Sequence, residues 1–300
     1  MTFSKLSKLV LALGASAALA ACGNSDSSND STDTSSDSTT EAAAITGPIS
    51  VISREEGSGT RDAFVEATGV MADDIDNTTA AATIMNGTDQ VITTVADDPN
   101  AIGYISLGSL NDTVTAVSVD GVEATEENVA SGDYAISRPF NIVYQGELEG
   151  VVADFHDFIF SEEGQAIVLD EGFVQAKADA EAYAGDGSQS GSITIVGSTS
   201  VSPVMEKLAE AYEELNSGVQ INITSNGSSA GVKAATDGTA DLGMASRALA
   251  DDETDVTAEP IAVDGVAVIV NPENGVSDLS LATVASIFTG ETTDWEGTAQ

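Results

Sequence analysis

Short apolar runs alternate with amphipathic stretches along most of the chain after residue 47. Three of these runs, at residues 49–53, 193–196 and 219–224, have the length of a buried strand. Each run leads through a turn rich in Gly and Ser into a helical pattern, and the clearest of these patterns covers residues 203–215. Strands that alternate with helices predict an α/β fold with parallel or mixed sheets.

The first residues of the chain lack this alternation. Lys5 and Lys8 precede a mostly apolar stretch at residues 9–19, and small residues then lead to the only cysteine, Cys22. This is the order of a secretory signal. The sequence Leu19-Ala20-Ala21-Cys22-Gly23 also resembles the lipobox of bacterial lipoproteins. That resemblance implies a signal peptide at residues 1–21 and lipidation of Cys22. An ordinary secretory signal or a buried structural cysteine is the alternative.

Two low-complexity stretches divide the remainder of the chain. Residues 22–46 are rich in Ser, Thr and Asp, which bury little apolar surface, so we expect a disordered tether there. Residues 183–192 are rich in Gly and Ser and are expected to be a linker. The folded part is thus expected in two segments, 47–182 and 193–300. After the signal peptide, no segment is long and apolar enough to span a bilayer.

The three turns place small hydroxyl residues where helices are expected to begin. The turns are Gly57-Ser58-Gly59-Thr60, Gly197-Ser198-Thr199-Ser200 and Gly227-Ser228-Ser229-Ala230-Gly231. Backbone N–H groups and the helix dipole make such a terminus an anion site. Ser and Thr are also the commonest helix caps, and capping is the simpler explanation of any single turn. Three such turns together favour an anion site.

The distribution of charge supports this interpretation. Nine Lys and Arg stand against 49 Asp and Glu, for a net charge of -40, which argues against binding nucleic acid or anionic lipid through a basic surface. Yet Arg54 and Arg61 bracket the first turn, and Arg247 follows a short apolar run. Arginine suits tetrahedral oxyanions because its guanidinium is planar, charged and multidentate. Since the overall field repels anions, capture has to depend on a local, dry cluster of donors.

The chain resembles the phosphate-binding proteins of the Pst importer over nearly everything after the tether. The resemblance is carried by residues 53–64 (SREEGSGTRDAF), 101–108 (AIGYISLG), 137–140 (SRPF), 197–203 (GSTSVSP), 226–231 (NGSSAG) and 241–247 (DLGMASR). It implies an α/β, two-lobed periplasmic-binding-protein-like (type II) fold with mixed sheets and a central ligand cleft. It also implies inorganic phosphate as ligand, ABC importer permease subunits as partners, and a lipid-anchored location on the extracytoplasmic face of the cell membrane.

Carried over position by position, the resemblance also implies a set of phosphate ligands. They are Arg54, Ser58, Gly59, Thr60, Thr199, Ser200, Ser228, Ser246 and Arg247. Glu56 would orient Arg54. Arg247 is a departure, because some relatives have an Asp there that accepts a hydrogen bond from protonated phosphate and so excludes sulfate. With Arg at this position, a preference for phosphate has to rest on another acceptor, or it is weaker.

The order of the segments is a second departure. In the family, the part that resembles residues 193–300 comes first and the part that resembles residues 48–176 comes second. We therefore expect a circular permutant in which the linker joins the old termini; a fragment of a longer tandem chain is the alternative. Because hinge crossings connect the lobes in this family, we expect one nearly contiguous lobe, at about 140–258. The other lobe would be split between 48–137 and 262–300.

Other functional classes have less support in the sequence. His156, the sole histidine, only borders an apolar helical stripe at residues 151–160, so we expect an edge position rather than a catalytic triad. No nucleophile elbow, phosphate loop or EF-hand spacing occurs, which predicts no catalytic residue, metal or cofactor. Trp295 is expected to pack near the hinge. The alternatives are a binder of sulfate or molybdate, a secreted phosphatase-like protein, and a surface or sensory protein that has lost transport.

Overall fold

A computed structural model describes residues 45–298 of the chain. The predicted signal peptide, the lipidation site Cys22 and nearly all of the predicted tether lie outside the described residues. Among the residues described, no helix has both the length and the apolar character needed to cross a bilayer.

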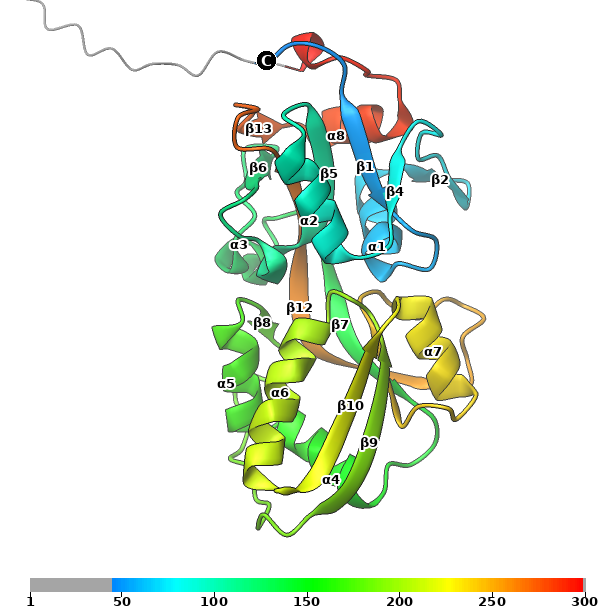
Figure 1. The fold of residues 1–300 in the computed structure, drawn as a ribbon, viewed down its shortest axis with the longest axis vertical. Coiled ribbons are helices and arrows are strands. Elements are labelled where there is room, and N and C mark those ends of the chain that lie inside the picture. Colours follow the sequence, from blue (N-terminus) through cyan, green and yellow to red (C-terminus); the bar gives the residue numbers. More distant parts are fainter. Residues whose placement is uncertain (1–44, 299–300) are drawn as a thin grey trace, which may run out of the picture. The chain divides into compact units, whose positions relative to one another are not determined.

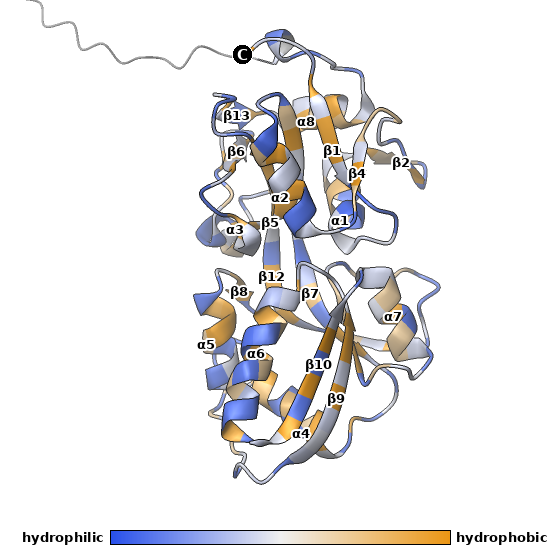
Figure 2. Ribbon diagram, in the orientation of Figure 1, coloured by the Kyte–Doolittle hydropathy of each residue, from blue (hydrophilic) through white to orange (hydrophobic). Residues whose placement is uncertain are grey.

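One lobe is built from a continuous stretch of the chain, and we call it the contiguous lobe. Its strands and helices are α4 (Gly150–Ile159), α5 (Glu162–Asp170), β9 (Ser190–Gly197), α6 (Ser202–Leu215), β10 (Gly218–Ser225), α7 (Ser228–Thr236) and β11 (Leu242–Ala245). Parallel strands β10, β9 and β11 form its sheet. Its core includes Phe155, Ile195 and Leu208, all fully buried. Helix α6 packs its apolar residues, such as Val204 and Leu208, against this core and carries polar residues on its other side (Figure 2).

The other lobe, which we call the split lobe, combines residues from both ends of the described chain. Its main elements are β1 (Ser50–Arg54), α1 (Gly59–Thr68), β4 (Thr83–Met85), α2 (Thr88–Asp97), β5 (Ala101–Ser106), β6 (Thr115–Val119), α3 (Glu126–Ser131), β13 (Asp278–Leu279) and α8 (Leu281–Thr289). Smaller elements are the hairpin β2 (Met71–Ala72) and β3 (Ile75–Asp76) and the short helices η1 (Leu107–Ser109) and η2 (Trp295–Gly297). Its core brings Phe64 and Tyr104 together with Phe288 from the far end of the sequence.

Two long strands, β7 (Ser137–Tyr144) and β12 (Thr257–Val270), cross between the lobes (Figure 1). Strand β12 pairs with β7 and with the short β8 (Val174–Gln175) in its first part, and with β5 and β6 over Val266–Val270. The strand order is therefore β10-β9-β11-β7-β12-β5-β1-β4, with parallel and antiparallel pairs. The α/β class, the mixed sheet and the division into one contiguous and one split lobe agree with the predictions from sequence.

The two ends of the described chain lie side by side in the split lobe. Pro48 forms a bridge with Asp294, and the N–H of Ile49 donates to the carbonyl of Thr293 at 2.8 Å. Trp295 is buried here, and its indole N–H donates to the carbonyl of Asn100 at 3.1 Å. The prediction that Trp295 packs near the hinge is therefore wrong, because the hinge strands are β7 and β12.

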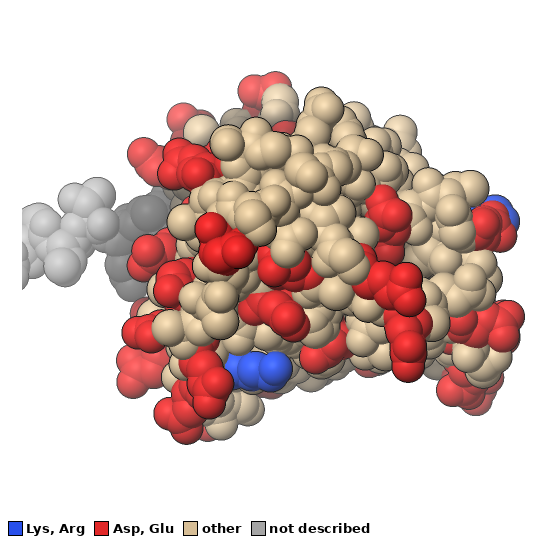
Figure 3. Space-filling model, turned by 90° about the horizontal axis from the view of Figure 1, so that it is seen from below, with Lys and Arg blue, Asp and Glu red and all other residues tan. Residues whose placement is uncertain are grey.

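The predicted elements around the three turns are all present, and the largest difference in a boundary is at the start of β9. Strand β9 begins at Ser190, inside the predicted linker, because it pairs with β10 along its full length. Acidic side chains are spread over the surface of the contiguous lobe that Figure 3 displays, with few Lys or Arg among them. Among the described residues, that face shows no cluster of Lys and Arg that could bind a polyanion.

Candidate anion site

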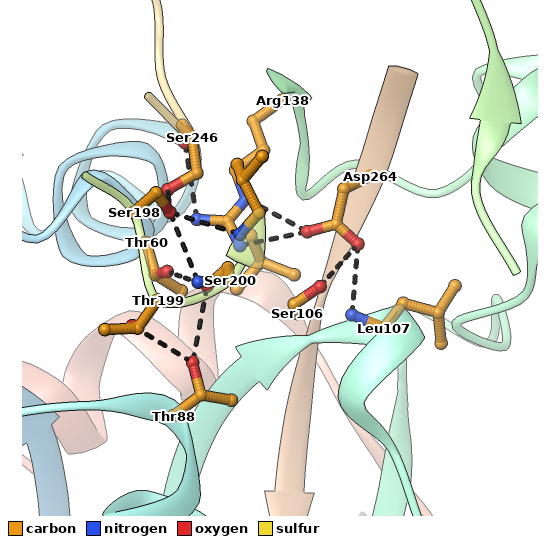
Figure 4. Close-up of polar contacts among 12 residues, drawn as sticks. Thr60, Thr88, Ser106, Leu107, Arg138, Ser198, Thr199, Ser200, Ser246 and Asp264 are labelled. Atoms are coloured by element: carbon orange, nitrogen blue, oxygen red, sulfur yellow. Dashed lines mark hydrogen bonds and ion pairs between the residues drawn. The ribbon is translucent and has the colours of Figure 1, made fainter. Parts of the chain in front are cut away.

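Four helices begin around one cluster of buried hydroxyl groups. Two of these helices, α1 and α2, belong to the split lobe and supply Thr60 and Thr88; the hydroxyls of Thr199 and Ser200 lie just before α6 of the contiguous lobe. The hydroxyl oxygens of Thr60 and Ser200 are 2.9 Å apart, and that of Thr88 is 3.4 Å from those of both Thr199 and Ser200 (Figure 4). At this point the lobes therefore meet through hydroxyl groups.

Three serines of the contiguous lobe continue the cluster. The Ser198 hydroxyl donates to that of Ser246 at 2.9 Å, and the Ser228 hydroxyl, at the start of α7, is 3.2 Å from that of Ser246. Gly59, at the start of α1, faces these serines across the lobe boundary. A Cβ atom there would lie 2.5 Å from the Ser228 hydroxyl oxygen and 2.8 Å from that of Ser246. Only glycine lets the backbone of α1 approach this closely.

Capping explains some of these hydroxyls but not all of them. The Ser58 hydroxyl caps α1 by accepting from the N–H of Arg61, and that of Ser198 accepts from the N–H of Ser200 in the turn before α6. Helices α2 and α7 begin instead after Gly87 and Gly227, and neither receives a side-chain cap. The N–H of Ser229, in the first turn of α7, donates to the carbonyl of Gly57 at 3.1 Å. The other first N–H groups of α2 and α7 are available to an anion, which the positive ends of the helix dipoles also favour.

Arg54 is the cation that borders this cluster most closely. Its side chain is 2% exposed, and its Nε and Nη2 atoms each donate to Glu55 at 2.8 Å. Nη2 also donates to the Thr199 hydroxyl at 3.0 Å, and Nη1 lies 3.5 Å from that of Thr60. Glu56 is exposed. The prediction that Glu56 orients Arg54 is therefore wrong: β1 ends at Arg54, and it is the next residue, Glu55, whose carboxylate turns back onto the guanidinium.

Tyr104 supports Arg54 from within the split lobe. Its hydroxyl accepts from the backbone N–H of Arg54 at 3.2 Å and lies 2.8 Å from that of Ser53. Its ring stacks on Phe64 with centroids 3.9 Å apart. Burial raises the pKa of Tyr104 to about 12, so the hydroxyl stays neutral at physiological pH. The carbonyl of Arg54 accepts from Arg61, whose guanidinium pairs with Asp76 at 2.7 Å.

Arg247 does not join the hydroxyl cluster with its side chain. Its guanidinium pairs with Glu253 through Nη1 and Nη2 at 2.7 and 2.8 Å, and with Asp62 of the split lobe through Nε at 3.0 Å. Contacts to the carbonyl of Ala248 and the hydroxyl of Ser229 use the remaining N–H donors. A guanidinium has five N–H donors, and all five are committed. The expectation that the Arg247 side chain binds the anion is contradicted by this geometry.

Burial and charge act against each other at Asp62, the partner of Arg247. Burial raises the pKa of the Asp62 carboxyl, and the positive charge of Arg247 partly opposes that rise. The pKa of Glu253 is lowered because its carboxylate accepts hydrogen bonds from Arg247. Arg247 thus bridges the two lobes through ion pairs with Asp62 of the split lobe and Glu253 of the contiguous lobe.

The structure adds residues to the site that the sequence analysis did not assign. Thr88 is 4% exposed and Ser198 is 2% exposed, and both lie inside the cluster. Thr88 follows Asn86-Gly87 at the start of a helix, which is the same Gly-hydroxyl pattern as in the three recognised turns. That signal was present in the sequence. The remaining predicted ligands, Ser58, Gly59, Thr60, Thr199, Ser200, Ser228 and Ser246, are brought together by the fold.

A groove leads from the surface to this cluster. It forms a cavity of about 320 Å³ lined from the split lobe by Gly87 and Thr88, and from the contiguous lobe by Thr199, Ser202 and Glu206. A larger cavity, of about 590 Å³, lies in the contiguous lobe around His156 and Tyr183 and contains none of the cluster hydroxyls. The smaller groove is the one with access to the anion-binding groups.

The described residues include no group of three or more His, Cys, Asp or Glu side chains that could hold a metal ion. His156 is partly buried and its Nε2 lies 2.8 Å from Glu259, outside the hydroxyl cluster. The arrangement as a whole is suited to holding an anion by hydrogen bonds from both lobes.

Comparison with known proteins gives consistent results. The family model of the PBP superfamily domain matches residues 15–163 and 182–299. Phosphate-binding protein PstS 2 of Streptococcus pneumoniae is 46% identical over 302 residues, which cover 99% of each chain. The crystal structure of a phosphate ABC transporter phosphate-binding protein from the same species has a TM-score of 0.69 and 48% identity, covering 84% of this chain and 100% of that one.

A more distant relative aligns differently. Phosphate-binding protein PstS of Bacillus subtilis is 35% identical over 128 residues, which cover 42% of this chain and 41% of its own. The alignment with the pneumococcal protein, in contrast, runs through nearly all of both chains. The order of segments in this chain is therefore also the order in that relative.

Proposed function

Because the chain belongs to the PBP superfamily domain family, we propose that it binds inorganic phosphate between its lobes and delivers it to the permease subunits of an ABC importer. The relatives and the solved structure that match most of its length are phosphate-binding proteins by name. They are substrate-binding components of a transporter, and no covalent step belongs to the proposed function.

One observation carries the choice of ligand class. Hydroxyls from both lobes, the uncapped starts of α2 and α7, and the buried guanidinium of Arg54 converge on one place. A tetrahedral oxyanion has four oxygens that such donors can share, and the buried guanidinium of Arg54 adds a charge-assisted bond. Closure of the two lobes on the ion would complete the site.

Phosphate is favoured over sulfate or molybdate by groups that can accept a hydrogen bond from the ion. At neutral pH phosphate carries a proton to donate and sulfate does not, so a dry acceptor opposes sulfate. The hydroxyls of Thr60 and Ser200 can accept as well as donate. No carboxylate occupies position 247, so a binder of another tetrahedral oxyanion stays the second candidate.

We further propose that the protein works on the extracytoplasmic face of the cell membrane, tethered through lipidated Cys22. The basis is the lipobox-like sequence that ends at Cys22 and the polar stretch that follows it. The proposed permuted order of its segments has separate support: the described ends lie side by side at Pro48 and Asp294, where a chain with the other order would run through.

Isothermal titration of the full chain in mild detergent tests the proposed ligand. We expect saturable one-to-one binding of phosphate and none of sulfate at matched ionic strength. Binding of sulfate or molybdate with equal affinity would transfer the assignment to the second candidate. A folded sample that gives no heat with any of the three anions would refute the proposal.

A further inference from the structure

A second guanidinium, that of Arg138, is buried beside the hydroxyl cluster. Arg138 lies on crossing strand β7, and its side chain is 1% exposed. Nε and Nη2 donate to one carboxylate oxygen of Asp264, on crossing strand β12, at 3.1 and 2.9 Å. Nη1 donates to the carbonyl of Ser246 at 3.3 Å. Arg138 therefore connects the hinge to a serine of the cluster (Figure 4).

The other carboxylate oxygen of Asp264 is held from the split lobe. It accepts from the Ser106 hydroxyl at 2.9 Å and from the N–H of Leu107 at 3.2 Å. The pair thus joins Ser106 and Leu107 of the split lobe, through both crossing strands, to Ser246 of the contiguous lobe. Asp264 has no lone pair directed away from these four donors, so its orientation, and that of Arg138, is fixed.

Arg138 also has N–H donors without an acceptor among the described residues, which distinguishes it from Arg247. Of the five N–H donors of a guanidinium, three have partners among the described residues, which leaves two. Uncommitted donors on a fully buried guanidinium are costly unless a ligand accepts from them. Every donor of Arg247, by comparison, has a protein acceptor.

The two buried arginines, Arg54 and Arg138, also repel each other electrostatically. Burial lowers the pKa of Arg138, the charge of Asp264 raises it, and the like charge of Arg54 lowers it further. Arg54 borders the cluster at Thr60 and Thr199, and Arg138 borders it at Ser246. An anion bound among these hydroxyls would be attracted by both guanidinium groups and would relieve their repulsion.

We propose that Arg138, oriented by Asp264, is the second cationic group of the anion site, and that its two uncommitted N–H donors serve the bound oxyanion. The inference rests on the proposed function, since it concerns the same site. It assigns to Arg138 the role that the sequence suggested for Arg247.

A neutral replacement of the pair tests this role apart from folding. Arg138→Gln alone leaves the buried Asp264 carboxylate without its counter-charge, which destabilises the protein whatever Arg138 does for the ligand. In the double variant Arg138→Gln/Asp264→Asn, the amide at position 264 can still accept from Ser106 and Leu107 and can donate to the amide at 138. The net charge of the protein is unchanged by the double substitution.

We expect the double variant to unfold in urea near the midpoint of the parent and to bind phosphate at least about tenfold more weakly by titration calorimetry. A folded double variant with the parent's Kd overturns the inference. The proposed function is judged separately, because it requires the parent to bind phosphate and Arg54→Gln to lose that binding whether or not the Arg138 pair matters.

A measurement on the unmutated pair covers the case in which the double variant does not fold. The chain has four arginines, so the variants Arg54→Lys, Arg61→Lys and Arg247→Lys each identify one side-chain NMR signal, and the signal of Arg138 follows by elimination. Addition of phosphate to protein labelled with ¹⁵N should shift the guanidinium signals of both Arg54 and Arg138. A shift of the Arg54 signals alone contradicts a ligand-binding role for Arg138.

Discussion

Arg54 and Arg247 flank the same pair of lobes, but their surroundings differ. Arg54 is buried and has one carboxylate partner, Glu55, and it directs the other donors at hydroxyls of both lobes. Arg247 forms ion pairs with two carboxylates, Asp62 and Glu253, which neutralise its charge. An arginine in a motif is therefore a ligand candidate only while its N–H donors have no protein acceptor. Arg54 should therefore control the affinity for the anion, and Arg247 should control the strength of the contact between the lobes.

Replacing Arg54 should give the largest effect. Arg54→Gln removes charge-assisted hydrogen bonds that are each worth about 1.5–3 kcal/mol, so we expect phosphate affinity to fall by roughly a hundredfold or more. Titration calorimetry measures the change. Lys207→Ala is the matched control, because Lys207 is an exposed cation paired only with Glu210 on the surface of α6. An unchanged Kd in Arg54→Gln would remove Arg54 from the site.

The close approach of the lobes gives the second prediction. Gly59→Ala places a methyl group 2.5 Å from the Ser228 hydroxyl oxygen across the lobe boundary. Such overpacking costs about 1–3 kcal/mol, so the Kd for phosphate should rise by roughly tenfold to a hundredfold. The melting temperature without phosphate should change little, since a helix accepts Ala readily.

Gly87→Ala is the control for this prediction. Gly87 also precedes a helix at the boundary, its φ of 169° is extended backbone open to any residue, and its nearest contact would be Thr199 at 3.9 Å. We expect parent-like binding. Equal weakening by both substitutions would show that the effect comes from the loss of glycine and not from a clash between lobes.

Removal of the Arg247 ion pairs between the lobes should have a smaller effect on the affinity for phosphate. Arg247→Gln removes the pairs with Asp62 and Glu253 but no donor from the hydroxyl cluster. A partly exposed pair contributes about 0.2–1 kcal/mol, so the Kd should rise by roughly threefold, mainly through faster release of phosphate. Stopped-flow measurement of dissociation separates the two rates. A loss as large as that of Arg54→Gln would make Arg247 a ligand after all.

The smallest expected effect is a pH dependence of stability at Glu253. Its pKa is lowered by the hydrogen bonds from Arg247, so the folded state favours the carboxylate. The stabilisation is complete above the unfolded value of about 4.5 and is lost as pH falls through the folded pKa. Urea unfolding at pH 7 should show Glu253→Gln less stable by about 1 kcal/mol, and the difference should shrink as pH falls below about 4.5. A difference that does not change with pH would point to packing instead.

Local chemistry made much of the fold and site predictable from the sequence. The turns at Ser58 and Ser228 could be placed because glycine, a hydroxyl residue and a helical pattern follow one another within a few positions. Thr88 obeys the same rule and could have been found in the same way. The choice between adjacent Glu55 and Glu56 depended on how the chain leaves β1, which sequence does not specify.

The role of Arg247 could not be predicted because one of its two carboxylate partners is distant in sequence. Asp62 belongs to the other lobe and meets Arg247 only when the lobes come together. The same holds for Arg138, whose partner Asp264 lies on the second crossing strand, 126 positions away. Motifs identify residue types at a site, but tertiary contacts decide which donors remain available to a ligand.

A crystal structure of the protein with phosphate tests the central claim most directly. We predict that the ion lies among the hydroxyls of Thr60, Ser200 and Ser246, within hydrogen-bond distance of the Arg54 guanidinium. Arg247 should keep its pairs with Asp62 and Glu253. A phosphate ion bound by the Arg247 side chain and away from Arg54 would contradict this account.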